Sequence, residues 1–437
     1  MPCEINIARA RISEQMEPRF HLLGNRFSER RPRRKQALSK SRTPWDLVGL
    51  LVLAGMVAAF HVGKAPPTLP SIRADLDASL RRAGWLLSII NLVTAMGGMA
   101  IALTADRLGH RRLILFGTAL SMATSLLGSS VESAGALLAM RVLEGLGFIS
   151  VVVAIPPLVV RVAATRDQRI ALAAWSTYMP SGAGGMMLIA ALVLQGGGSW
   201  RWVWAIAAAA SGAMLLALVL RTRGRPELDP VAVTRRPILH EMAEVASSGG
   251  PLAIAICFGA YSCCWFAVVG FLPTLQVERL HFTAETAAIV TTVVTMVNIA
   301  GNLAAGWLLQ RRVPRVAIIV GATLSMAVCA SAIFVDGVPD IARLVLAGVY
   351  SAVIGVVPGC LFTAIPLHAP RPQLVGAATG LLMQVSNLGA LVGPPITAAL
   401  VSAGGWPAAA WMTSLALLLA AGAGVFLHWR ERRRLWS

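Results

Sequence analysis

The sequence predicts an all-α, polytopic membrane protein whose twelve transmembrane helices form two pseudo-symmetric six-helix bundles. Three observations support this prediction: long apolar runs, an uneven distribution of basic residues over the loops, and an internal repeat. Only 13% of the 437 residues are charged and 56% are hydrophobic, whereas about a quarter of the residues in a soluble domain are charged. A soluble fold is therefore excluded.

The apolar runs are long enough to cross a bilayer as helices, because about 20 residues span a hydrocarbon core of about 30 Å. Glycine and proline are frequent inside them, as is typical of membrane helices that pack closely or kink. We expect spans at 45–66, 84–104, 112–131, 135–160, 170–195, 201–221, 250–275, 284–309, 315–335, 342–366, 375–400 and 405–428.

The net charge of +18 reflects orientation in a membrane, not nucleic-acid binding. Most lysines and arginines fall in the N-terminal segment, in alternate loops and at the C-terminus, which is the positive-inside pattern. It predicts a multi-pass protein of a bacterial inner membrane with both termini in the cytoplasm. Residues 1–44 and 429–437 read as basic cytoplasmic tails, the first disordered and able to contact anionic lipid; a wrongly assigned start codon is the alternative for residues 1–44.

The chain divides into two halves that repeat each other. The predicted domains are residues 45–221 and 250–428, joined by a cytoplasmic linker at 222–249. "FGTALSMATS" (116–125) is echoed by "VGATLSMAVC" (320–329), and "GKAPPTL" (63–69) by "GFLPTL" (270–275). Matches at nearly one offset indicate a duplication, and parallel six-helix repeats place a substrate site between the halves near the bilayer midplane.

The loop "ALTADRLGHRR" (102–112) carries the strongest motif. It resembles the signature G-x-L-A-D-R-x-G-R-[KR] of the major facilitator superfamily, with departures at Ala102, Thr104 and His110. The loop "GWLLQRRVPR" in the second half keeps Gly306, Leu308 and Arg311 but has Gln310 in place of the acid. The resemblance implies the fold of that superfamily, and a cytoplasmic gate formed by Asp106, Arg107, Gly109 and Arg111 with an echo at Gly306 and Arg311.

Physical chemistry supports such a gate. Asp106 at a helix end can complement the positive terminus of a neighbouring helix, and arginines can bind the carbonyl groups that end a helix. Gly109 permits a tight turn. The alternative interpretation is that the arginines only set topology, which leaves the aspartate unexplained.

The fourth span contains "RVLEGLG", which resembles the R-x-x-x-G element of the same superfamily. Arg141 and Glu144 lie about 9 Å inside the span and three residues apart, and therefore on one helix face. Ionisable residues at that depth face a bundle interior or an aqueous path. The pair either neutralises itself or serves proton coupling or anion attraction.

Lys64, in "FHVGKAPP", has two possible roles. It lies 19 residues after Trp45, which is about 28 Å of helix and reaches the outer boundary, where a lysine can anchor in the headgroups. However, Phe271 occupies the corresponding place in the second half, and an anchor would be useful in both halves. Residues expected to line the transport path are Lys64, His61, Arg141, Glu144, Tyr178, Asn298, Gln384 and Asn387.

Span eleven carries a G-x-x-x-G-P-P pattern, similar to the element that drug/proton antiporters have in span five. Because span five lacks it here, a typical drug antiporter is disfavoured, and helix packing is the expected role of these residues. The residues assigned to kinks or packing are Gly145, Gly389, Gly393 and Pro394.

These features predict a secondary active transporter. The sequence has no phosphate-binding G-x-x-x-x-G-K-[ST] loop, no catalytic motif and no metal-ligand spacing among its cysteines, so we expect no enzyme activity, cofactor or metal. The segments "GKAPPTLPSIRADL" (63–76), "AGWLLSIINL" (83–92), "RVLEGLGF" (141–148) and "SWRW" (199–202) resemble bacterial permeases of the cyanate-transporter group. That resemblance implies a small anion as substrate. We also expect a proton as coupling ion and a monomer as the working unit. Efflux of drugs or hydrophobic compounds is the alternative, and a non-transporting receptor is disfavoured.

Overall fold

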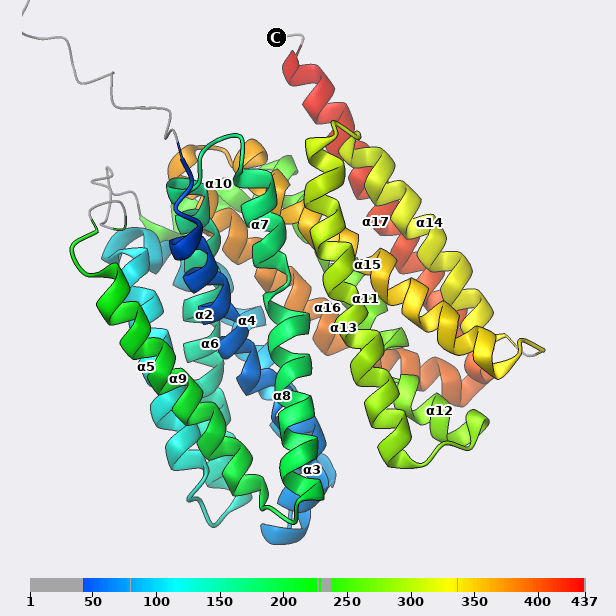
Figure 1. The fold of residues 1–437 in the computed structure, drawn as a ribbon. Helices are drawn as coiled ribbons and strands as arrows, with labels where there is room; N and C mark the ends of the chain where they lie inside the picture. Colours follow the sequence, from blue (N-terminus) through cyan, green and yellow to red (C-terminus); the bar gives the residue numbers. More distant parts are fainter. Residues whose placement is uncertain (1–41, 79, 226–227, 229–236, 336, 436–437) are drawn as a thin grey trace, which may run out of the picture. The chain divides into compact units, whose positions relative to one another are not determined.

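The computed structural model describes residues 42–78, 80–225, 228, 237–335 and 337–435. The predicted N-terminal tail, except its last three residues, and linker residues 226–227 and 229–236 lie outside these ranges. Within them the regular elements are helices (Figure 1). The first half contains α2 (Trp45–Gly63), α3 (Ala65–Asp75), α4 (Leu80–Leu108), α5 (His110–Gly128), α6 (Ala134–Val162), α7 (Gln168–Ser176), α8 (Tyr178–Gln195) and α9 (Trp200–Thr222).

A short helix in the linker, α10 (Ile238–Ala246), precedes the second half. That half contains α11 (Gly249–Val268), α12 (Leu272–Leu280), α13 (Ala284–Gln310), α14 (Arg315–Phe334), α15 (Asp340–His368), the 3-10 turn η2 (Pro372–Leu374), α16 (Val375–Gly404) and α17 (Trp406–Leu435).

Eleven of the described helical segments are long and apolar enough to cross a membrane. The predicted span 112–131 corresponds to α5, which is not among these eleven. With only 19 residues, α5 cannot offer an apolar stretch of 18 without including Arg111 and Arg112 in its first turn. The all-helical fold is confirmed, and the difference from twelve lies in the polarity of this one helix.

The first span is longer than the sequence predicts. It runs from Trp45 to Asp75, with α2 passing directly into α3 at Lys64. Prolines fill the first helical positions of α3, where a missing N–H costs nothing. Lys64 therefore lies inside a span of 31 residues and not at its end.

The same helix pairs pack in both halves. In the first half α5 packs on α6 and α9, and α2 packs on α8; in the second half α14 packs on α15 and α17, and α11 packs on α16. The break between α2 and α3 is matched by the break between α11 and α12, so that Lys64 and Phe271 occupy equivalent positions before the second helix. The internal repeat seen in the sequence is thus present in the packing.

The two halves meet mainly through α4 against α16, and through α7 and α8 against α13. At the α4–α16 crossing, the backbones approach so closely that a Cβ on Gly380 would lie 2.7 Å from the carbonyl oxygen of Gly98 and 2.7 Å from the Cβ of Ala102. We call the end of the bundle where α10, Asp106 and the start of α16 lie the gate end (Figure 1).

Candidate functional site

The structure brings four of the predicted path residues together inside the first half. His61 and Lys64 come from the α2–α3 junction, and Arg141 and Glu144 from one face of α6. Their side chains are 0–1% exposed. We call these four residues the charge cluster. A lysine without solvent contact is not at the lipid headgroups.

Glu144 is the centre of the charge cluster. Its Oε1 accepts a hydrogen bond from Lys64 Nζ and lies 3.2 Å from His61 Nδ1, and its Oε2 lies 2.8 Å from Arg141 Nη1. Arg141 also donates to the backbone oxygens of His61 and Leu86. One carboxylate thus faces two basic side chains, and with Lys64 protonated and His61 neutral the cluster carries one excess positive charge.

Polar groups of α5 and α9 complete the charge cluster. Lys64 Nζ donates to Ser125 Oγ at 2.7 Å and lies 4.4 Å from the ring centroid of Trp204, a cation–π contact. His61 Nε2 lies 2.9 Å from Ser211 Oγ, which itself donates to the Ala207 carbonyl.

The hydrogen bonds of Ser211 indicate where the imidazole proton lies. Because the Ser211 hydroxyl proton is used toward Ala207, Nε2 of His61 must be the donor to Ser211, which leaves Nδ1 of a neutral imidazole as an acceptor. That nitrogen lies 3.3 Å from Lys64 Nζ and 3.2 Å from Glu144 Oε1. Lys64, His61 and Glu144 therefore lie within hydrogen-bonding distance of one another.

The predicted gate residues lie at the gate end, on both sides of the contact between the halves. The carboxylate of Asp106 lies against Gly376 in the first turn of α16, where the field of the helix terminus is positive: a Cβ on Gly376 would stand 2.7 Å from Asp106 Oδ1. His110 Nε2 lies 3.2 Å from the same oxygen. Gly109 has φ +101°, which a side chain would disfavour.

The two arginines of the gate motif have different partners. Arg111 Nε donates to Thr222 Oγ1 at 2.8 Å, which joins the start of α5 to the end of α9 within the first half. Arg107 Nη2 lies 3.3 Å from Glu241 of α10. In the second half, Gly306 allows α13 to approach Ala173 of α7, and Arg311 lies over the ring of Trp307 at 4.0 Å.

The remaining predicted path residues are distributed differently. Gln384 connects the halves, since its Oε1 accepts from the Met99 backbone N–H at 3.3 Å. Asn298 lies inside the second half, where it donates to the Ser351 carbonyl at 3.1 Å and accepts from Asn302. Asn387 donates to the Met383 carbonyl one turn earlier on its own helix.

The four residues assigned to packing all lie inside helices, and three of them are at close approaches. A Cβ on Gly145 would stand 3.1 Å from the Val93 side chain, and one on Gly393 would lie 3.0 Å from the Cys263 backbone. Gly389 faces the Gly259 backbone at still closer range. Pro394 lies inside α16.

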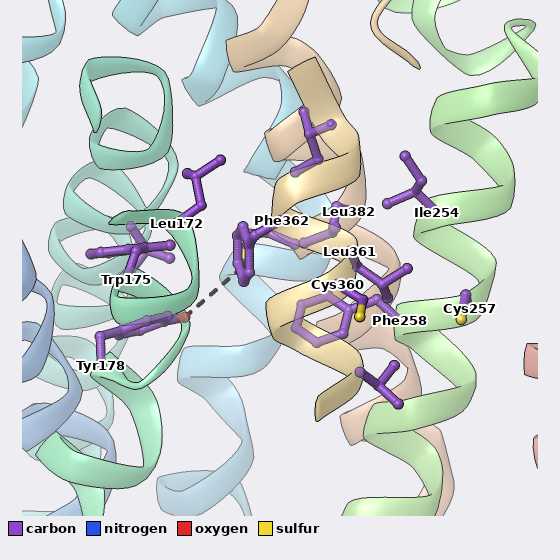
Figure 2. Close-up of a cluster of buried hydrophobic side chains, with 14 of the residues drawn as sticks. Leu172, Trp175, Tyr178, Ile254, Cys257, Phe258, Cys360, Leu361, Phe362 and Leu382 are labelled. Carbon is purple, nitrogen blue, oxygen red and sulfur yellow. Dashed lines mark hydrogen bonds between the residues drawn. The ribbon is translucent and has the colours of Figure 1, made fainter. Parts of the chain in front are cut away.

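Tyr178 belongs to a group of aromatic side chains that crosses between the halves (Figure 2). It stacks on Trp175 at 4.4 Å, and Trp175 meets Phe362 of α15 edge-on at 6.5 Å. Phe362 in turn meets Phe258 of α11 at 5.8 Å, and Phe258 stacks on Tyr261. We call these five residues the aromatic bridge.

Tyr178 is the one member of the aromatic bridge among the residues that the sequence predicts to line the transport path. Trp175 lies three residues before it, across the break between α7 and α8, and that spacing is a signal that could have identified a shared face. Its indole Nε1 is buried without a hydrogen-bond partner in the described structure. The Tyr178 hydroxyl has Met383 Sδ as a weak acceptor at 4.0 Å.

Two repeated helical halves, with small-residue contacts between them and a charged loop at one end, are the architecture of transporters built from parallel repeats. The family model "Major Facilitator Superfamily" matches residues 51–385. The chain belongs to that superfamily and is one of its transporters.

Solved structures agree with the fold. The human organic anion transporter MFSD10 superposes with a TM-score of 0.71 at 16% identity, over 86% of this chain and 98% of that one. FucP in its outward conformation gives a TM-score of 0.72 at 15% identity, over 87% and 98% of the chains. At these identities the likeness concerns the fold alone.

Curated relatives match over shorter stretches. The cephamycin export protein CmcT of Amycolatopsis lactamdurans is 32% identical over 111 residues, which is 25% of this chain and 22% of that protein. The methyl viologen resistance protein SmvA of Salmonella typhimurium is 28% identical over 157 residues, 35% and 31% of the two chains. The chain thus aligns with less than a third of the length of either relative.

Proposed function

We propose that this chain is a proton-coupled secondary transporter whose solute carries an apolar or aromatic body, and that it corresponds to the efflux alternative. The observation that carries the proposal is the aromatic bridge, which lies between the halves where repeats of this kind place a substrate. Aromatic rings bind planar and cationic organic solutes through their faces. Relatives named for methyl viologen resistance and for cephamycin export are consistent with such a solute.

The charge cluster is the proposed coupling site. It has one more proton than neutrality requires, and Lys64, His61 and Glu144 lie within reach of one another to pass it on. Release of that proton leaves a neutral cluster, and its return restores one buried positive charge. A buried charge is costly to keep away from water, whereas a neutral cluster is not, so the two protonation states differ strongly in the free energy of burial. Movement of α6 against α2 and α3 is the step that would connect the charge cluster to one side of the membrane.

A small anion is the second candidate, as expected for the cyanate-transporter group. Its support is the excess of cations over carboxylates in the charge cluster. In the described state, however, Lys64 and Arg141 point into the first half and are satisfied by Glu144, serine and backbone oxygens. An anion would have to displace Glu144 to reach them.

The two candidates predict different ligands for the purified protein. We expect methyl viologen or ethidium to raise its melting temperature saturably, and acetate or nitrate to leave it unchanged. Phe362→Leu should reduce the shift caused by the aromatic cations, whereas Phe334→Leu, an equally buried ring that stacks on Trp406 instead, should preserve it. Saturable stabilisation by an anion alone, lost in Lys64→Gln, would replace the first candidate with the second.

The gate motif gives a second test of the transport proposal. Asp106→Asn should leave membrane insertion intact and lower transport about tenfold or more, because a carboxylate at a helix N-terminus contributes up to about 2 kcal/mol to the closed contact with α16. Solute flux in proteoliposomes measures the effect. Asp77→Asn is a matched control, since Asp77 is exposed and its positive φ suits asparagine. Wild-type flux in Asp106→Asn would refute the gating role.

A further inference from the structure

The linker helix α10 presents two acids to both halves of the transporter at once. Glu241 and Glu244 lie three residues apart, on one face of the helix. Their side chains are 10% and 25% exposed, so both are held against the bundle. Neither residue belongs to the gate motif, and the second-half gate loop has no acid of its own at Gln310.

Each half contributes one arginine to this pair of acids. Arg107, in the last turn of α4 in the first half, lies 3.3 Å from Glu241. Arg371, in the loop before α16 in the second half, binds Glu244 in the two-pronged geometry of guanidinium and carboxylate, with Nε and Nη2 at 2.8 and 2.7 Å. These hydrogen bonds raise the pKa of the Arg371 guanidinium above its ordinary value.

A further contact ties the two ion pairs into one network. Arg371 Nη2 lies 3.9 Å from Glu241 Oε1, so Glu241 faces an arginine from each half. The chain on both sides of α10 is the connection between the halves, and α10 contacts both α4 and α16. The halves cannot separate at the gate end unless α10 gives up either Arg107 or Arg371.

We propose that α10 is a strap across the gate end, and that Glu241 and Glu244 are positioning residues that hold the halves closed there through Arg107 and Arg371. This inference rests on the proposed transport function and adds a third component to the gate, beside Asp106 and the α4–α16 contact. Partly exposed ion pairs are weak, and each should shift the equilibrium between closed and open states by about two- to fivefold. The strap therefore adjusts the balance between two states and does not lock one.

The experiment measures the separation of the halves and needs no solute. Spin labels are placed on two exposed positions at the gate end, Arg223→Cys in the first half and Gln310→Cys in the second, and the distance distribution is recorded for the full chain in nanodiscs. We expect the double variant Glu241→Gln, Glu244→Gln to increase the long-distance population about threefold or more relative to the labelled protein that keeps both glutamates. Glu132→Gln, an exposed carboxylate in the loop between α5 and α6, should cause no change.

Reversing the charges makes the test specific. Glu244→Arg alone should increase the long-distance population further, because two guanidinium groups then face each other. Combining it with Arg371→Glu restores an ion pair and should return the distribution to within about twofold of the original. An unchanged distribution in the double glutamine variant, or a reversed pair that fails to restore closure, would overturn the strap. Failure of the transport proposal would give a different result. The variants would still shift the distance distribution, but adding a solute would not shift it.

Discussion

Replacing Glu144 with glutamine is expected to abolish transport and to lower the free energy of unfolding by about 3–5 kcal/mol. The carboxylate accepts from Lys64 and Arg141, and all three side chains are essentially without solvent contact. Glutamine keeps the shape but removes the one negative charge of the cluster, so that two cations remain buried without a counter-charge. The large effect comes from that residual charge and not from lost packing.

Lys64→Met tests whether the destabilisation comes from uncompensated buried charge or from the loss of a contact. With methionine at 64, Arg141 and Glu144 remain as a neutral pair 2.8 Å apart, so we expect a stability close to that of the wild type while coupled transport is lost. Glu132→Gln controls for removal of a carboxylate from an exposed site. Thermal unfolding in detergent and proton-driven flux in proteoliposomes measure the two effects. Equal destabilisation by Glu144→Gln and Lys64→Met would contradict the excess-charge description.

How far the sequence predicts this cluster depends on which contacts are local. Arg141 and Glu144 could be paired from their spacing, because residues three apart on a helix share a face. Lys64 and His61 could be assigned to one face for the same reason. That these two faces meet at Glu144 is a contact between helices 80 residues apart in the chain, and no local pattern specifies it.

The length of the first apolar run does not predict where the first span ends, as the position of Lys64 shows. Twenty apolar residues suffice to cross a bilayer, so a span that begins at Trp45 should end near Lys64. The helix instead restarts at Ala65 with prolines in its first positions and continues to Asp75. Because proline is common in the first turn of a helix and also just after a helix has ended, the same letters permit both outcomes.

The fold itself was predictable because its signals are repeated over many residues. Hydrophobicity and the duplicated segments act over the whole chain, and the packing of both halves agrees with them. The aromatic bridge was not predictable as a group, since Trp175, Phe258 and Phe362 come from three separate helices of two halves. Single aromatic residues in apolar runs carry no sign of which neighbours they will meet.

Replacing Gly380 with alanine is expected to open the contact between α4 and α16 and to lower transport about tenfold or more. The added Cβ would lie 2.7 Å from the Gly98 carbonyl oxygen, 2.7 Å from the Met99 Cα and 2.7 Å from the Ala102 Cβ. Two of these atoms are backbone, so no rotamer change can relieve the overlap and the helices must move apart. Such overpacking costs about 1–3 kcal/mol, which corresponds to about five- to 150-fold in the equilibrium between closed and open states.

Alanine gives a clear test because it stabilises an isolated helix relative to glycine, whereas the overlap with α4 destabilises the structure. In a helix interior, glycine to alanine is favourable by about 1 kcal/mol, so any loss at Gly380 must come from the contact with α4. Gly348 of α15 and Gly422 of α17 are matched controls, since a Cβ at either position would meet no atom within 4 Å. Alanine at those two sites should preserve flux and raise the melting temperature. If Gly380→Ala behaves as they do, the close approach of α4 to α16 is not what holds the gate end closed.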